Sequence, residues 1–336
     1  MENFTVNMRI VITTIFEPTE AISLFSNIEG CSLIVVGDKK TPAGWHCKNV
    51  EYLSLCEQES LGFSLAKHLP YNHYCRKMLG YLWAIRNDAE CIVDTDDDNI
   101  PKKNWSFPDF EGKYDFIEEN LDFINVYQLY TKQKIWPRGL PLNAINKSIN
   151  LERKMSIKPC RVGVWQGLAD EDPDVDAIYR LTNNTPCYFN ERKPLVLGKG
   201  TVSPFNTQNT IVRKELYALM YLPTYVTFRF TDILRSLVAQ PIMWHHSYLL
   251  GFTNSTVVQK RNIHDYMQDF ISELPMYQYC EKALGTVAAS VASNQSIESN
   301  LYNAYSALLK EHIVSEQEMY PVEAWLRDLE IFKKPN

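Results

Sequence analysis

The residues best suited to chemistry form one acidic run, Asp94-Thr95-Asp96-Asp97-Asp98-Asn99. The run follows segment 89–93, whose apolar and β-branched side chains predict a strand. Carboxylates grouped at a strand end repel one another unless a positive charge compensates them. A divalent cation that bridges to a diphosphate is a common reason to hold them together. The run therefore predicts a metal site in an enzyme that acts on a nucleotide-activated substrate.

Three other interpretations can be compared with the spacing of this run. An EF-hand calcium loop beginning at Asp94 would need glycine at the position of Asn99 and glutamate at that of Trp105, so it fails. An aspartyl-phosphate phosphatase normally has Thr or Val where this chain has Asp98, which disfavours that class. A solvated acidic loop without a function stays open, because runs of charge are usually solvent-exposed.

Alternating strand and helix patterns place the acidic run in a sheet. Strands are predicted at 8–15 and 32–36, and helices at 19–28 and 73–87. We therefore expect an α/β fold in which the acidic run lies at the carboxyl end of a parallel strand, where open α/β sheets bind their ligands.

The rest of the chain changes character twice. Segment 100–158 is expected to be irregular, and it is followed by a strand at 161–165. A helix is expected at 214–220 and another from Thr231. Beyond residue 262 the pattern is helical throughout, with helices expected at 264–274, 278–292, 299–312 and 316–329. We therefore predict a catalytic domain at 1–262 and a C-terminal helical region at 263–336.

Composition excludes several classes of protein. The chain has 336 residues and a net charge of -6 without long basic runs, which argues against binding to nucleic acid or to anionic lipid. Its eight cysteines form no Cys-x-x-Cys motif and are expected to be reduced. No export signal and no membrane-spanning segment are recognisable. We therefore expect a cytoplasmic protein, an expectation that leaves room for peripheral association with a membrane.

Several motifs together resemble the STELLO-type glycosyltransferases. They include the acidic run and further segments spread over nearly the whole chain: 71–85, 136–142, 173–176, 232–235, 240–244 and 324–329. A more distant similarity is to the reversibly glycosylated polypeptides, which include UDP-arabinopyranose mutases. The resemblance implies a GT-A glycosyltransferase fold, a Rossmann-like mixed sheet flanked by helices with a C-terminal helical appendage.

The chain departs from plant STELLO proteins at three points. We expect it to lack their N-terminal transmembrane anchor, and it carries an extra aspartate, Asp98. His245 and His246 have no counterpart in the family pattern, so we expect them to pack or to face solvent rather than bind metal.

The resemblance also implies roles for residues that bind the donor. Asp96 is the first choice for the metal ligand, Asp98 the second, and Asp94 lies nearer the ribose or caps the turn after the strand. Arg76 is expected to reach a phosphate, and Lys77 is a weaker choice for the same contact. Other candidates for the donor's nucleoside or sugar are Thr13, Thr14, Asp38, Trp136 and Arg138.

An inverting transferase needs a base beside the acceptor hydroxyl. Asp232, at the predicted start of a helix, is our choice for that base, although helix capping would explain it equally well. Asp174 and Asp176 are rivals for the base or for contacts to sugar hydroxyls.

The sequence therefore predicts a glycosyltransferase that uses Mn²⁺ or Mg²⁺ to move a sugar from a nucleoside diphosphate, taken as UDP, to a glycan or lipid-linked acceptor. A nucleotide-sugar mutase and a catalytically silent GT-A scaffold are the alternatives. The intact acidic run argues against the scaffold.

Overall fold

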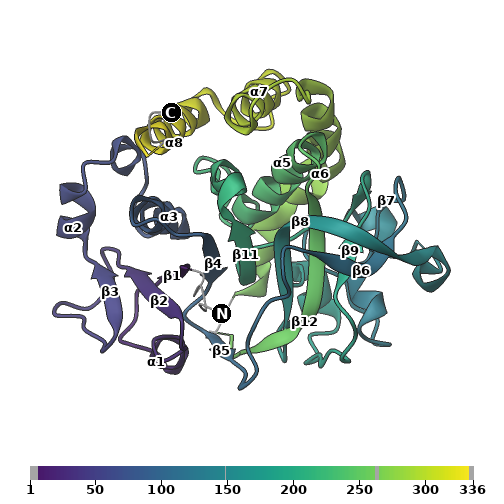
Figure 1. Ribbon diagram of the computed structural model, residues 1–336, viewed down its shortest axis with the longest axis horizontal. Coiled ribbons are helices and arrows are strands. Elements are labelled where there is room, and N and C mark those ends of the chain that lie inside the picture. Colours follow the sequence, from purple (N-terminus) through teal and green to yellow (C-terminus); the bar gives the residue numbers. More distant parts are fainter. Residues whose placement is uncertain (1–6, 148, 262–264, 333–336) are drawn as a thin grey trace, which may run out of the picture.

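The computed structural model describes residues 7–147, 149–261 and 265–332. Ten strands form one mixed sheet in the order β3-β2-β1-β4-β11-β8-β6-β9-β12-β5, and β8 also pairs with β12. Helices flank this sheet and run along its upper edge (Figure 1). The predicted fold class, a mixed α/β sheet with helices packed on it, is confirmed, and it is consistent with a GT-A-like fold.

The first part of the sheet is parallel and follows the predicted alternation. Strands β1, β2, β3 and β4 lie side by side with the same direction. Helix α3 packs on β1 and β2 through Gly80, whose Cα is so close to Val11 and Val36 that a Cβ atom would lie 2.6 and 2.7 Å from their methyl groups. The elements are β1 (Met8–Thr13), α1 (Glu20–Phe25), β2 (Cys31–Val36), β3 (Val50–Leu53), α2 (Leu55–Ser60), α3 (Lys77–Arg86) and β4 (Cys91–Thr95).

The second part of the sheet is built around one long strand, β8. Its partner β11 runs antiparallel to both β8 and β4 and so joins the two parts. The segment expected to be irregular contains the strand β6, which pairs with β8, so that expectation was wrong. The elements are β5 (Asn99–Pro101), β6 (Glu111–Ile117), β8 (Met155–Asp170), α4 (Ala177–Thr182), β9 (Leu195–Leu197), β11 (Asn209–Arg213) and β12 (Leu249–Gln259). Strands β7 (Asp122–Phe123) and β10 (Thr201–Val202) pair with each other in a separate two-stranded sheet.

Short 3₁₀ segments connect these elements. They are Ser64–Lys67, Tyr74–Arg76, Val126–Leu129, Leu142–Ala144, Leu151–Lys154, Lys214–Met220 and Glu316–Glu318. The predicted helix at 214–220 is therefore a 3₁₀ segment, and the first residues of the one predicted at 73–87 are too.

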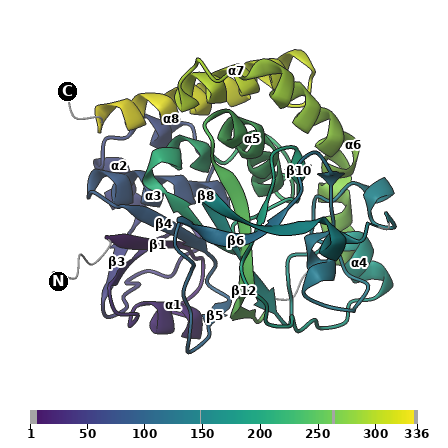
Figure 2. The same ribbon diagram turned by 45° about the vertical axis from the view of Figure 1, so that its right-hand side comes forward.

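The C-terminal helices pack on the part of the molecule that carries the sheet (Figure 2). They are α6 (Tyr266–Ser290), α7 (Ile297–Lys310) and α8 (Met319–Ile331), and they contact α5 (Thr231–His245) and the 3₁₀ segment that follows β11. Helix α6 continues through Pro275, where two helices were expected. Asp328 on α8 accepts hydrogen bonds from the backbone N–H groups of Ser64 and Leu65, both 2.8 Å long. The predicted boundary at 262/263 falls among residues outside the described ranges, so it stays a prediction.

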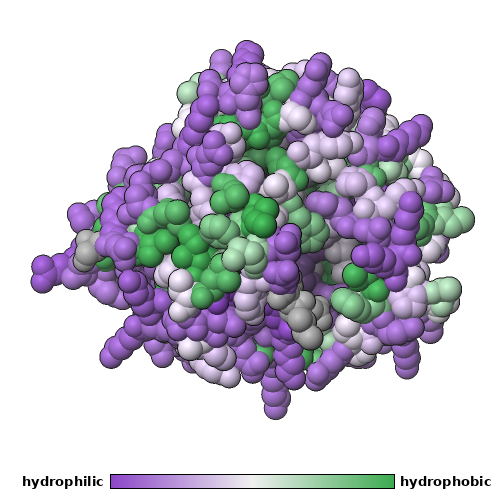
Figure 3. Space-filling view, turned by 180° about the vertical axis from the view of Figure 1, so that it is seen from behind, coloured by the Kyte–Doolittle hydropathy of each residue, from purple (hydrophilic) through white to green (hydrophobic). Residues whose placement is uncertain are grey.

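The surface in Figure 3 is mostly hydrophilic, with hydrophobic residues gathered in separate patches. In the parts of the chain that the structure describes, no helix combines the length and the apolar character needed to cross a bilayer.

Candidate functional site

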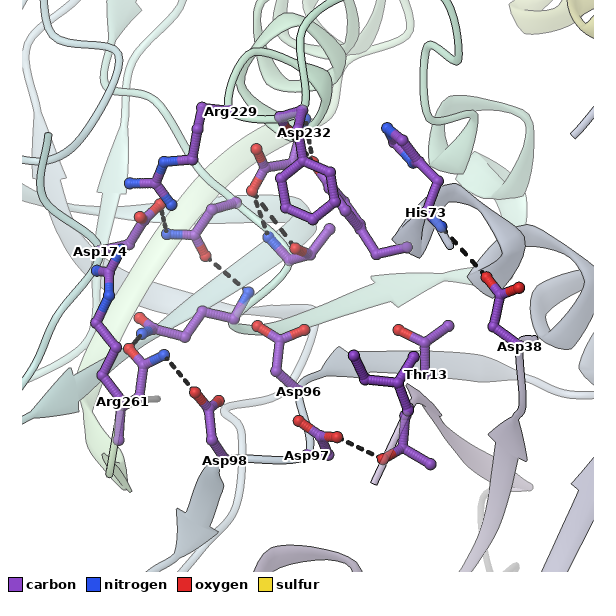
Figure 4. A pocket seen from close by; sticks show the side chains of 18 of the residues that line it. Thr13, Asp38, His73, Asp96, Asp97, Asp98, Asp174, Arg229, Asp232 and Arg261 are labelled. Atoms are coloured by element: carbon purple, nitrogen blue, oxygen red, sulfur yellow. Dashed lines mark hydrogen bonds between the residues drawn. The ribbon is translucent and has the colours of Figure 1, made fainter. Parts of the chain in front are cut away.

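A cavity of about 310 Å³ opens at the carboxyl ends of β1, β2 and β4. Thr13, Asp38 and His73 lie at one end, and Asp174 and Arg261 at the other, with the acidic run between them (Figure 4). Residues that also line it include Thr14, Ile15, Phe16, Lys40, Asn206, Thr207, Gln208, Phe228, Arg229 and Gln259. The cavity therefore brings together residues from both parts of the sheet.

Asp94 belongs to strand β4 rather than to the loop after it. Its side chain is fully buried and lies between two cations, 2.9 Å from Lys77 Nζ and 2.9 Å from Arg235 Nη1. It does not line the cavity, which argues against the expected place of Asp94 beside the ribose or a metal. The same geometry argues against the expected phosphate contact of Lys77, because its ammonium group is buried among Asp94, Asp96 and the carbonyl oxygen of Thr95.

The next three aspartates face the cavity. Asp96 accepts from Lys77 with one carboxylate oxygen, Asp97 accepts from the Thr14 hydroxyl, and Asp98 accepts from the Gln259 amide. Burial is the main cause that raises the pKa of Asp96 to about 7 and those of Asp97 and Asp98 to about 6, and repulsion between neighbouring carboxylates adds to it. A cation bound beside these three crowded carboxylates would stabilise their ionised forms.

The donor atoms fit a hard divalent cation that keeps open coordination positions. In the described part of the chain, no three or more His, Cys, Asp or Glu side chains are arranged to enclose a metal ion. Mg²⁺ and Mn²⁺ in nucleotide sites are commonly bound by one or two carboxylates, waters and the substrate's phosphates. Asp96 and Asp98 offer such carboxylates.

The other predicted donor residues divide between the cavity and the core. Thr13, Thr14 and Asp38 line the cavity, and Asp38 accepts a hydrogen bond of 3.2 Å from the backbone N–H of His73. Arg76 lies outside it. Its side chain is 2% exposed, and Nε and Nη2 donate to Gln58 Oε1 over 2.9 and 2.6 Å. The expected contact of Arg76 with a phosphate is therefore not supported by the structure.

Arg138 holds two of the predicted catalytic aspartates. Its guanidinium donates two hydrogen bonds of 2.8 Å to Asp174 and two of 3.0 and 2.9 Å to Asp232. All three residues line the cavity and are largely buried. Asp232 is desolvated, yet Arg138 reverses the effect of burial and lowers its pKa below the ordinary value. Asp232 is therefore a weak base.

Trp136 and Asp176 lie together in the core, outside the cavity. The indole N–H of Trp136 donates to Asp176 Oδ2 over 2.7 Å, and Asp176 also accepts from the backbone N–H of Tyr179 as the cap of α4. The structure therefore argues against a sugar contact for Trp136 and against Asp176 as a base. His245 and His246 bond to Ser293 and Asn300, and neither lines the cavity.

Several residues that line the cavity were not predicted. His73 is one of them: burial lowers its pKa to about 4, and its Nδ1 accepts from the backbone N–H of Cys75. Phe16 and Phe228 add apolar surface. Arg229 lies three residues before the motif at 232–235, which was the available signal for it, whereas Arg261 follows β12, a strand that the sequence did not predict.

Comparisons with known proteins agree with the motifs. A family model described as STELLO glycosyltransferases matches residues 229–334. The Arabidopsis thaliana proteins named probable glycosyltransferase STELLO1 and STELLO2 are 27% and 25% identical to this chain over 97% of its length. The chain spans about 45% of the length of either relative. The predicted resemblance to the STELLO glycosyltransferases is therefore confirmed along nearly the whole chain.

Proposed function

We propose that this chain is a metal-dependent glycosyltransferase that moves a sugar from a nucleoside diphosphate, taken as UDP, to a glycan or lipid-linked acceptor. The observation that carries the proposal is the position of Asp96, Asp97 and Asp98 in the middle of the cavity, between the ends of the parallel strands on one side and Asp174 and Asp232 on the other. Similarity to proteins named probable glycosyltransferases supports the class of reaction.

The cavity suggests an orientation for the donor. Asp38 would accept a hydrogen bond from an N–H group of the nucleobase, and the apolar surface of Phe16 would cover the nucleoside. The diphosphate would then lie beside Asp96 and Asp98, which would hold the cation. When bound, Mn²⁺ or Mg²⁺ would neutralise the negative charge that the diphosphate gains as it leaves.

The sugar and the acceptor would lie toward Asp174 and Asp232. Because its pKa is lowered, Asp232 would take the acceptor's proton late, when the acceptor oxygen has begun to bond to the anomeric carbon and has become acidic. Such a single displacement by the acceptor, with Asp232 as the base, corresponds to an inverting mechanism. Arg138 would keep both carboxylates ionised and oriented throughout.

A thermal-shift screen with UDP-, GDP- and CMP-sugars, with and without Mn²⁺, tests the proposal. A ligand that binds only the folded protein raises the melting temperature, so we expect a Mn²⁺-dependent increase with a UDP-sugar. Product analysis with the donor alone should give only slow hydrolysis. Interconversion of the donor's sugar ring would indicate a mutase, and no binding of any nucleotide sugar would indicate a silent scaffold.

A further inference from the structure

Two arginines line the far end of the cavity and come from separate segments. Arg229 precedes helix α5, and Arg261 follows strand β12. Figure 4 shows both across the acidic run from Thr13 and Asp38, the end assigned above to the nucleoside. They therefore face whatever lies beyond the donor's diphosphate.

Arg261 has hydrogen-bonding capacity to spare. Its side chain is 7% exposed, and its Nη2 lies 3.2 Å from Asp269 Oδ2. Its buried Nε has no hydrogen-bond partner among the residues that the structure describes. Buried Nε atoms of Arg9, Arg180, Arg192 and Arg235 share that property, but those residues do not line the cavity. Arg261 thus places a buried guanidinium at the cavity, and its Nε–H group lacks an acceptor among the described residues.

The second arginine is anchored in a fixed place. Arg229 Nε donates to Glu273 over 3.0 Å, its Nη2 lies 2.9 Å from the same carboxylate, and Glu273 is fully buried on helix α6. Arg229 Nε also lies 4.0 Å from Asp269, the partner of Arg261. One acidic residue therefore lies between the two guanidinium groups and holds them near each other.

The electrostatics of Arg261 favour an added negative charge. Burial is the largest cause that lowers the pKa of Arg261, and repulsion from Arg229 and Arg180 adds to it, while Asp172 and Asp174 act in the opposite direction. Both of these carboxylates are already held, Asp172 by Arg180 and Asp174 by Arg138 and the amide of Asn206. A bound anion would relieve this repulsion and supply the acceptor that Nε lacks.

We propose that Arg229 and Arg261 form a subsite for an anionic group, a phosphate or a carboxylate, carried by the transferred sugar or by the acceptor. Its assignment to that end of the substrate rests on the proposed function. The planar guanidinium fork suits both groups, because it can donate two parallel hydrogen bonds to a pair of oxygens. The substrate class would then be an acidic or phosphorylated sugar or acceptor, bound in addition to the donor's diphosphate.

Titration with inorganic phosphate tests the subsite directly, first on the free protein and then on protein saturated with UDP and Mn²⁺. We expect phosphate to bind in both cases. Arg261→Gln should weaken the affinity for phosphate at least about tenfold, because charge-assisted hydrogen bonds are lost. Arg9→Gln is the matched control, because Arg9 also has an unpartnered buried Nε but lies in another groove. It should change phosphate affinity less than about twofold.

These titrations separate a distinct anion subsite from a contact with the donor's own diphosphate. If Arg261→Gln weakens UDP itself about tenfold and phosphate competes with UDP, the arginines hold the donor's diphosphate and the second subsite is wrong. Equal phosphate affinity in wild type and Arg261→Gln also overturns it. If neither nucleotide nor cation binds, the proposed function fails. The titration of the free protein would still measure phosphate binding by Arg229 and Arg261. Should Arg261→Gln fold poorly, Arg261→Lys keeps the charge without the fork and should still weaken phosphate severalfold.

Discussion

Arg138 and Asp232 face each other as a two-pronged ion pair, with Nη1–Oδ1 and Nη2–Oδ2 distances of 3.0 and 2.9 Å in a buried setting. Arg138 forms the same kind of pair with Asp174. The pairs place one positive charge between two negative ones at the end of the cavity assigned to the acceptor. This arrangement decides what substitutions of either aspartate should do.

Asp232→Asn should affect both turnover and stability. We expect transfer to fall by about 10²–10⁴-fold if Asp232 takes the acceptor's proton, because an amide cannot do so at neutral pH. Unlike a change at a simple helix cap, it should also lower the free energy of unfolding by about 1–3 kcal/mol, because Arg138 loses half of its buried compensation. Initial rates and urea denaturation check the two effects. Near-wild-type turnover in a folded variant would move the base to Asp174.

Asp96→Asn should remove the metal dependence of nucleotide binding. Asp96 is the predicted ligand whose carboxylate faces the cavity and is also fixed by Lys77. Calorimetric titration of UDP with and without Mn²⁺ should show equal, weak affinity in this variant and a Mn²⁺-dependent gain in the wild type. Asp97→Asn is the control, because Asp97 bonds to Thr14, and it should keep the gain. Wild-type affinity that is unchanged by EDTA would contradict a bridging cation.

Arg76→Gln should reduce stability and leave donor affinity within about twofold. Its guanidinium is used inside the protein, by Gln58 and by the carbonyl oxygen of Leu69, and removing it leaves buried acceptors without donors. We expect a loss of about 1–3 kcal/mol in the free energy of unfolding. Lys67→Gln, a change at an exposed residue of the 3₁₀ segment Ser64–Lys67, serves as the control and should alter neither quantity appreciably. A large drop in UDP affinity for Arg76→Gln would restore the phosphate contact.

Glu318→Gln should flatten the dependence of stability on pH. Burial raises the pKa of Glu318 to about 7 although it accepts hydrogen bonds from Tyr221, Thr224 and Tyr225. A carboxyl whose pKa is higher in the folded than in the unfolded protein binds more protons when folded, so stability falls as pH rises from about 4.5 to about 7. The wild type should lose about 1–3 kcal/mol more than Glu318→Gln between pH 5 and pH 7. Denaturant titrations at both pH values measure this difference, and parallel curves would refute it.

The acidic run shows how far the sequence alone reaches. The apolar segment before it, 89–93, predicted a strand that ends near a ligand site, and in the structure β4 does end beside the cavity. The pattern could not show that pairing with β11 extends through Thr95. Because β4 therefore ends two residues later than expected, Asp94 lies inside the sheet and only the next three aspartates line the cavity.

The direction in which a side chain points was the second feature that the sequence could not predict. The helix that carries Arg76 was predicted, but its first turn is a 3₁₀ segment, and Arg76 points toward Gln58 rather than toward the cavity. Arg229 and Arg261 carry no motif of their own, and they meet because α5, α6 and β12 pack together. Contacts between distant segments leave no local pattern in a sequence, so this part of the site could not be predicted.

The buried pair of Arg229 with Glu273 has a consequence for synthesis on the ribosome. Thr13, Asp38 and the acidic run belong to the first hundred or so residues, whereas Glu273 follows much later and Asp328, which caps the segment at Ser64, later still. Until then Arg229 lacks its buried counter-charge. The acceptor end of the cavity would therefore be assembled last.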